Sequence, residues 1–145
     1  MPTEDGESDT VGMEAEFVRS ERLFTGAPYA YAAIARQGCL VVTAGACPLD
    51  DHGCVVTTGD IAAQTRKALE NLRITLQECG AAMGDVLKTT IFVSSSSRAD
   101  LQLAWREVAT AFGHAEPPST LLGVAVLGYP DQLVEIEAIA LAPAR

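Results

Sequence analysis

The sequence has few features of a membrane protein, a secreted protein or a nucleic-acid-binding protein. Its 145 residues contain no run of lysine or arginine and carry a net charge of -9, so the phosphates of a nucleic acid would repel the chain. No uninterrupted apolar run reaches the roughly 18 residues that a membrane-spanning helix needs. The first residues also lack the positive and then apolar regions of a signal peptide. We therefore expect a cytoplasmic protein that binds neither nucleic acid nor a membrane.

Cysteine and histidine are too sparse to indicate a disulfide framework or a metal centre. The 4 cysteines include no CxxC pair, and they do not reach the density of a stapled secreted domain. The segment CPLDDHGC at 47–54 matches no zinc spacing and lacks a fourth ligand. Neither a GxGxxG motif nor a P-loop is present. We expect free thiols, no metal and no cofactor.

The distribution of charge distinguishes an acidic N-terminal segment from the rest of the chain. Of the 19 acidic residues, six precede the first basic residue, Arg19, whereas the rest of the chain has 13 acidic and 10 basic residues. With 48% apolar and 20% charged residues, the chain is able to bury a core. We expect a flexible acidic tail over residues 1–15 and one domain over residues 16–145.

Apolar runs and turn residues predict several strands. Residues 30–35 and 39–44 are separated by a short segment ending in Gly38, which predicts a hairpin. A short extended segment is expected over 54–58. The remaining expected strands are rich in β-branched or apolar residues and cover 86–93, 119–127 and 133–141.

Apolar residues at three- and four-residue steps predict two helices. The first follows Asp60 and ends at Gly80, a typical C-terminal cap. At the start of the second helix, Ser97 and Asp100 have the spacing of a capping box, and Gly113 stops this helix. Its apolar stripe consists of Leu101, Ala104, Trp105, Val108 and Phe112.

The order of these elements predicts a sheet with one bare face. Crossovers between parallel strands are right-handed, so both helices should cover the same side. In strand 86–93, Leu87 and Ile91 share one face and Val86 and Phe92 the other, so neither face is polar. Because a large exposed apolar face is rare on a monomer, we expect an obligate oligomer.

Two carboxylates interrupt the last expected strand, LVEIEAIAL. Successive side chains of a strand point to opposite faces, so Glu135 and Glu137 share one face while Val134 and Ile136 point to the other. The acidic face would look into a subunit interface, where clefts collect a few polar groups among apolar walls.

Six blocks of the sequence occur in an order that resembles a known family. They are PYAYA at 28–32, VVTAG at 41–45, GDIAAQTRKALENL at 59–72, GDVLKTTIFV at 84–93, PPSTLLGVAVL at 117–127 and VEIEAIA at 134–140. Together they resemble the reactive-intermediate deaminases, which are the RidA or YjgF-like proteins, also called the endoribonuclease L-PSP-like family. The similarity covers almost the whole expected domain.

This resemblance implies an α+β fold of the chorismate-mutase type, in which a mixed sheet carries two helices on one face. It also implies a homotrimer with inward-facing sheets and small-molecule clefts between subunits. Members of the deaminase branch hydrolyse enamines and imines to carbonyl compounds and ammonia, without a metal or an organic cofactor. Matched by motif, the family's cleft glutamate is Glu135, the expected catalytic residue. The expected substrate-binding residues are Tyr29, Gly45, Gln102 and Ser119.

The chain departs from the deaminase pattern at two positions. Ser119 stands where the resemblance places an arginine that clamps the substrate carboxylate, and Ala44 replaces the usual serine. Loss of a bidentate guanidinium removes a contact of about 1.5–3 kcal/mol, so we expect a preference for ligands without a carboxylate. Lys88 and Arg98 lie in matching blocks and are candidates for a relocated clamp.

Two functions stay open at this point. The first is a cofactor-independent enamine or imine deaminase, in which Glu135 moves a proton or positions water. The second is a non-catalytic protein that binds a metabolite or regulates a partner, with Glu135 only accepting hydrogen bonds across the interface. Glu137 is expected to be structural, and Tyr29 either covers a ligand or packs at the interface.

Overall fold

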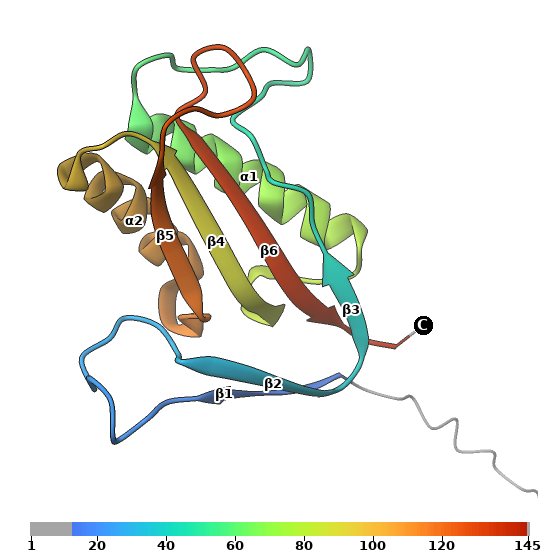
Figure 1. Cartoon of the computed structure of the whole chain (residues 1–145). Coiled ribbons are helices and arrows are strands. Elements are labelled where there is room, and N and C mark those ends of the chain that lie inside the picture. The colour runs from blue at the N-terminus through green and yellow to red at the C-terminus, as the bar shows by residue number, and fades with distance from the viewer. Residues whose placement is uncertain (1–12, 145) are drawn as a thin grey trace, which may run out of the picture.

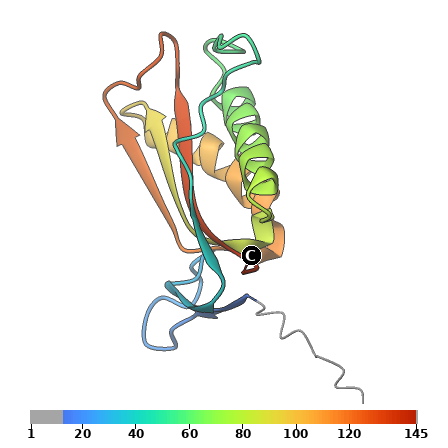
Figure 2. The ribbon, with the colours of Figure 1, turned by 90° about the vertical axis from the view of Figure 1, so that its right-hand side faces the viewer.

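The computed structural model describes residues 13–144, and a four-stranded mixed sheet with the order β3-β6-β4-β5 forms its centre. Two α-helices cover one face of this sheet, and a two-stranded ribbon lies at its lower end (Figure 1). Figure 2 shows the helices on one side and no element over the other side. The α+β architecture with both helices on one face is therefore confirmed. Residues 1–12 of the expected acidic tail lie outside the described part.

The sheet is formed by β3 (Cys39–Val42), β4 (Val86–Ser94), β5 (Ser119–Val124) and β6 (Val134–Ala142). β4 and β5 are parallel and are connected through α2 (Arg98–Phe112) and η2 (Gly113–Ala115). α1 (Ile61–Glu78) and η1 (Met83–Asp85) lie between β3 and β4 in the chain. β6 is antiparallel to both of its neighbours, β3 and β4.

Local signals explain α1 well. The Asp60 side chain accepts a hydrogen bond from the Ala63 backbone amide (2.9 Å), and Gly80 has a φ of 78° just after the helix. The buried stripe of α1 packs against the sheet and α2 to form the core, and it includes Ala68, Leu69, Leu72 and Leu76.

The predicted hairpin over 30–35 and 39–44 is wrong. β2 (Ala32–Gln37) pairs with β1 (Glu14–Val18), whereas β3 pairs with β6. Gly38 has a φ of 134°, and a Cβ atom there would lie 2.8 Å from the Ala142 carbonyl oxygen. The chain therefore passes at Gly38 from the ribbon into the main sheet.

A register shift in β4 overturns the predicted assignment of its faces. Val86 pairs with Ala140 while Lys88 pairs with Ile139, so one extra residue stands in β4. As a result Val86, only 1% exposed, joins Ile91 in the core cluster. The prediction that Val86 lies on the face opposite Ile91 is wrong.

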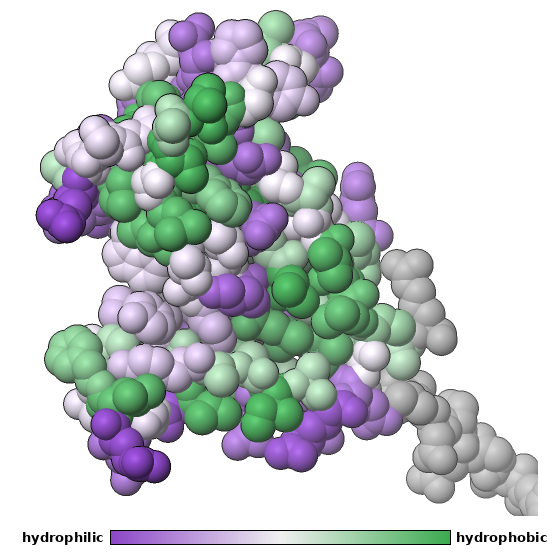
Figure 3. All heavy atoms as spheres, in the orientation of Figure 1, coloured by the Kyte–Doolittle hydropathy of each residue, from purple (hydrophilic) through white to green (hydrophobic). Residues whose placement is uncertain are grey.

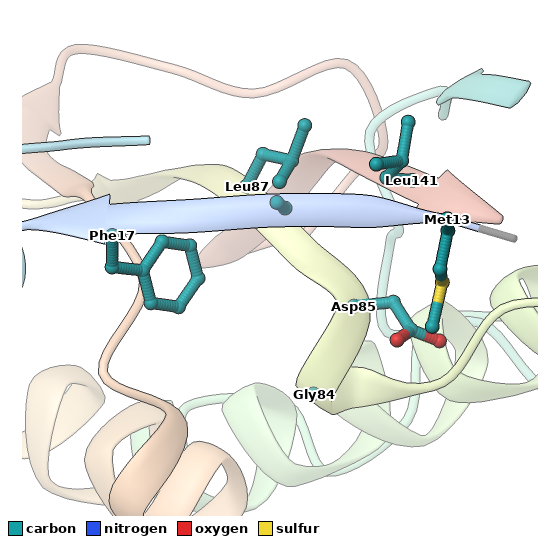
Figure 4. A pocket seen from close by; sticks show the side chains of 7 residues that line it. Met13, Phe17, Gly84, Asp85, Leu87 and Leu141 are labelled. Carbon is teal, nitrogen blue, oxygen red and sulfur yellow. The ribbon is translucent and has the colours of Figure 1, made fainter. Parts of the chain in front are cut away.

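Leu87, displaced from the core cluster, points to the ribbon instead. It lines a cavity of about 260 Å³ between the ribbon and the lower end of the sheet, together with Met13, Phe17, Asp85 and Leu141 (Figure 4). The Asp85 carboxylate accepts a hydrogen bond from the Ala82 backbone amide (2.8 Å). This cavity lies at the opposite end of β6 from Glu135.

Three smaller expectations also need correction. Residues 54–58 form no strand and contribute only the isolated bridge between Leu49 and Val55. β5 ends at Val124 rather than at residue 127. The Ser97 side chain makes no cap hydrogen bond.

The first turn of α2 is held by Ser95 instead. Its hydroxyl donates to the Asp100 carboxylate (2.7 Å) and accepts from the Ser97 backbone amide (3.0 Å). The predicted capping box between Ser97 and Asp100 is therefore wrong, and Ser95 links the Ser97 amide to the Asp100 carboxylate in its place.

The uncovered face of the sheet is apolar, as expected. Figure 3 shows this face, where apolar side chains gather over the strands. The large exposed apolar side chains of β3, β5, β6 and the β5–β6 loop are Leu40, Val42, Leu122, Val126 and Ile139.

Candidate functional site

Glu135 lies on the uncovered face, in register with Phe92 of β4. The neighbouring residue Ile136 is fully buried and bridges to Ala46 through two backbone hydrogen bonds of 2.7 and 3.1 Å. This bridge fixes residues 44–47 beside β6. A Cβ atom at Gly45 would lie 2.6 Å from Glu135 Cδ, so only glycine admits the carboxyl group here. The structure thus brings together Glu135 and Gly45, two residues that the family resemblance assigns to one site.

Cys47 is a further contact of Glu135. Its Sγ atom lies 3.5 Å from Glu135 Oε1 and 3.5 Å from the Gly45 carbonyl oxygen. Burial, and then the charge and hydrogen bond of Glu135, raises the pKa of the Cys47 thiol to about 11. Cys47 therefore stays protonated at neutral pH and is able to donate to the carboxylate.

An open cleft adjoins this corner. It measures about 510 Å³, and its walls include Gly45 and Cys47 on one side, Lys67 and Asn71 of α1 on another, and Tyr129 of the β5–β6 loop. The Asn71 amide donates to the carbonyl oxygens of residues 47 and 49, at 2.9 and 3.0 Å. The two residues that contact the Glu135 carboxyl group thus face a space large enough for a small molecule.

Tyr29 belongs to a separate aromatic cluster. Its ring meets Tyr31 edge-on at 5.9 Å and Trp105 of α2 at 6.5 Å between ring centroids. α2 covers the face of the sheet opposite to Glu135 (Figure 2). A single subunit therefore does not bring Tyr29 to the Glu135 corner.

Ser119 lies near the aromatic cluster. A hollow of about 110 Å³ is lined by Pro28, Trp105 and Ser119, among other residues. The Ser119 hydroxyl accepts a hydrogen bond from Thr89 (2.7 Å) and donates one to the Pro117 carbonyl oxygen (2.8 Å). Its proton is therefore committed inside the subunit.

Gln102 is exposed on α2, three residues before Trp105. Residues three apart on a helix are neighbours on its surface, so Gln102 lies on the same side as the aromatic cluster. The expected site residues thus form two groups. One contains Glu135 and Gly45, and the other contains Tyr29, Gln102 and Ser119.

Glu137 and Lys88 share the middle of the uncovered face. They line a small pocket of about 110 Å³ together with Thr90 and Ile139. The Lys88 ammonium donates to the Thr120 hydroxyl (2.5 Å), and within residues 13–144 neither Lys88 nor Glu137 forms an ion pair. Arg98, the other candidate clamp, is an exposed residue at the start of α2.

Comparison with known proteins identifies the family. The family described as Endoribonuclease L-PSP matches residues 20–142. The chain belongs to this RidA/YjgF-like family. A 2-iminobutanoate/2-iminopropanoate deaminase from Salmonella typhimurium is 34% identical over 104 residues, which cover 71% of this chain and 80% of that protein. A 3-aminoacrylate deaminase from Acinetobacter baylyi is 34% identical over 114 residues, or 79% of this chain and 86% of that protein.

A solved structure from the same family confirms the fold. The crystal structure of a Rid-family protein of unknown function from Yersinia pestis superposes with a TM-score of 0.81 at 28% identity, covering 89% of this chain and 99% of that one. The predicted RidA/YjgF-like fold is therefore correct.

Two features are absent from the described residues, a membrane-spanning helix and a cluster of metal ligands. No helix between residues 13 and 144 has the length and apolarity needed to cross a bilayer. The same residues contain no group of three or more histidine, cysteine or acidic side chains placed to hold a metal ion.

Sequence reasoning missed the parts of the site that depend on distant contacts. The sequence presents Cys47 only as a side chain of a metal-ligand type, and no local pattern indicates Asn71. A usable signal for Cys47 existed, because residues two apart in an extended chain share a face, and Gly45 was already assigned to the site.

Proposed function

We propose that this protein is a RidA-like hydrolase of an enamine, an imine or a related small carbonyl compound, with Glu135 as its catalytic residue. The observation that carries the proposal is the Glu135 carboxyl group, which lies on an apolar sheet face and is held over Gly45. Two relatives that are each 34% identical are named as deaminases of imines or of 3-aminoacrylate. Their names support a substrate of this class.

We further propose that the active form is a homotrimer with its clefts between subunits. An apolar sheet face exposed to water favours association. The two groups of site residues lie on different faces of one subunit, and a neighbouring copy is needed to bring Tyr29 and Gln102 to Glu135. The oligomer therefore completes the site as well as covering the sheet.

Proton transfer by one carboxyl group is sufficient for the reaction. Glu135 takes a proton from water as the water oxygen adds to the carbon of a protonated imine. It then gives this proton to the amine nitrogen and takes the proton of the new hydroxyl group as the carbonyl forms and ammonia leaves. The departing ammonia takes this last proton from Glu135, so the carboxylate is regenerated and the net change converts a protonated imine and water into a carbonyl compound and ammonium. A general acid–base group contributes about 10²- to 10⁴-fold to such a rate.

The preference for ligands without a carboxylate is supported by Ser119. Its hydroxyl proton is bonded to the Pro117 carbonyl oxygen, so this side chain does not replace a charged bidentate donor. The same observation favours a second candidate function, a binding protein that keeps the cleft but does not turn over its ligand. The net charge of -9 argues against RNA as the substrate.

Ammonia release from imines generated in situ tests the proposal. We expect turnover of a neutral imine, slower turnover of 2-aminoacrylate, and a loss of at least about 100-fold in Glu135→Gln. Glu137→Gln is the matched control, because Glu137 lies two residues away on the same face and has no catalytic role in the proposal. Ligand binding without turnover in the wild type would instead support the binding function.

A further inference from the structure

The Glu135 carboxyl group has one protein partner among the described side chains. Cys47 Sγ lies 3.5 Å from Oε1, within hydrogen-bond distance for sulfur. No described hydrogen bond or ion pair involves Oε2. The two oxygens therefore differ, because one is engaged by a thiol and the other is available to water or a ligand.

The position of Cys47 is fixed from three directions. Ala46, next to it in the chain, bridges to Ile136 of β6. The Asn71 amide binds the Cys47 carbonyl oxygen at 2.9 Å, and Pro48 is among the largest fully buried residues. The thiol is thus presented to Glu135 by a backbone that is tied to both α1 and β6.

The thiol also has the protonation state that a donor needs. Its pKa is raised to about 11, first by burial and then by Glu135, so the S–H proton is retained at neutral pH. A thiolate beside the carboxylate would instead repel it.

We propose that Cys47 is a positioning residue for the candidate catalytic glutamate: its S–H group donates to Oε1 and holds the carboxyl group so that Oε2 faces the reacting water. This inference rests on the proposed function of Glu135. A weak donor suits the role, because it orients the carboxyl group through Oε1 and leaves Oε2 basic enough to accept and return a proton.

Kinetics of three variants test this role. We expect Cys47→Ala to lower kcat about three- to tenfold with little change in KM, as the loss of one hydrogen bond would. Cys47→Ser keeps a donor and should recover kcat to within about twofold of the wild type. Cys54→Ala, which removes an exposed thiol of the same loop, should leave both constants unchanged. Equal activity of all variants, or an equal loss in Cys47→Ala and Cys47→Ser, would overturn the proposal.

The infrared S–H stretching band provides a readout that does not need turnover. The Cys47 band, identified by its loss in Cys47→Ala, should lie at lower wavenumber than the other thiol bands and should rise in Glu135→Gln, where the acceptor is a neutral amide. A band that does not respond to Glu135→Gln would show that the hydrogen bond is absent. If the band responds but no imine is hydrolysed, the contact exists and the proposed function fails.

Discussion

The backbone of Gly45 lies directly against the Glu135 carboxyl group, which occupies the space that a side chain at position 45 would need. A Cβ atom at position 45 would lie 2.7 Å from Glu135 Cγ and 2.6 Å from Cδ. Glycine at this position is therefore a requirement of the Glu135 conformation rather than of a turn.

Gly45→Ala should consequently impair the site more than the fold. The added methyl group displaces the Glu135 side chain, and a torsion held about 30° off its staggered position costs about 0.5–1.5 kcal/mol. Imine hydrolysis should fall to nearly the level of Glu135→Gln, while urea denaturation shows only this small loss of stability. Gly84→Ala is the control, because a Cβ atom there meets nothing within 4 Å. Full activity in Gly45→Ala would contradict the assignment of Glu135.

The helices and the central strands followed from local sequence, whereas their pairing did not. α1 was predicted because Asp60, its apolar stripe and Gly80 all act within the helix. The hairpin error arose because the partner of β2 is β1, whose sequence EAEFV lies in an acidic segment and gives no strong strand signal. Side chains alone do not reveal a bulge, so the displacement of Leu87 from the core cluster was not foreseen.

The candidate site, like the fold, was predictable where it depends on sequence motifs and not where it depends on contacts between distant residues. Glu135 and Gly45 were assigned to the candidate site through the family's motifs, and the contact between them is observed. The contact of Cys47 with Glu135 joins residues 88 positions apart, so no local pattern reports it. The separation of Tyr29 from Glu135 also depends on which face of the sheet α2 covers in the assembled fold.

Gln64 is a second feature that a helical pattern does not predict. It is fully buried in α1, where its amide oxygen accepts from the Leu133 backbone amide (2.8 Å) and its nitrogen donates to the Asp131 carbonyl oxygen (3.0 Å). Gln64→Leu would leave these backbone groups unsatisfied and should cost about 2–4 kcal/mol in the free energy of unfolding. Gln77→Leu, at an exposed position of the same helix, should change it by less than about 0.5 kcal/mol. Equal effects in urea denaturation would contradict this role for Gln64.

The thiols of the 47–54 loop should differ in reactivity with pH. With a pKa of about 11, only about one Cys47 thiol in a thousand is ionised at pH 8, and the thiolate is the reactive form. Cys54 is exposed and should react with iodoacetamide first, as followed by mass spectrometry of peptides. Between pH 8 and pH 10, modification of Cys47 should accelerate about 100-fold.

Glu135→Gln should raise the rate at Cys47 at a fixed pH, because it removes a negative charge that opposes ionisation of the thiol. Modification of Cys47 in the wild type as fast as that of Cys54 would show that the thiol is neither buried nor paired.

The assembly prediction is tested on the uncovered face. Val42 is 69% exposed in one subunit, so a charge there costs little in a monomer. In a trimer that buries this face, the carboxylate of Val42→Asp would lose its water, and a contact with Lys88, which lines the same small pocket, would offset only part of this cost, so association should weaken. Sedimentation equilibrium should give the wild type about three times the 15.2 kDa mass of one chain and the variant a smaller mass.

Ile74→Asp is a control for the mass alone, since Ile74 is an exposed apolar residue of α1, on the helix side of the sheet, and it also lines the open cleft beside Gly45. It should leave the mass unchanged. Imine hydrolysis should be lost together with association in Val42→Asp, because Glu135 would then stand alone, without Tyr29 and Gln102 of a neighbouring copy. An active single chain, or an unchanged mass of Val42→Asp, would remove the reason for placing the site between subunits.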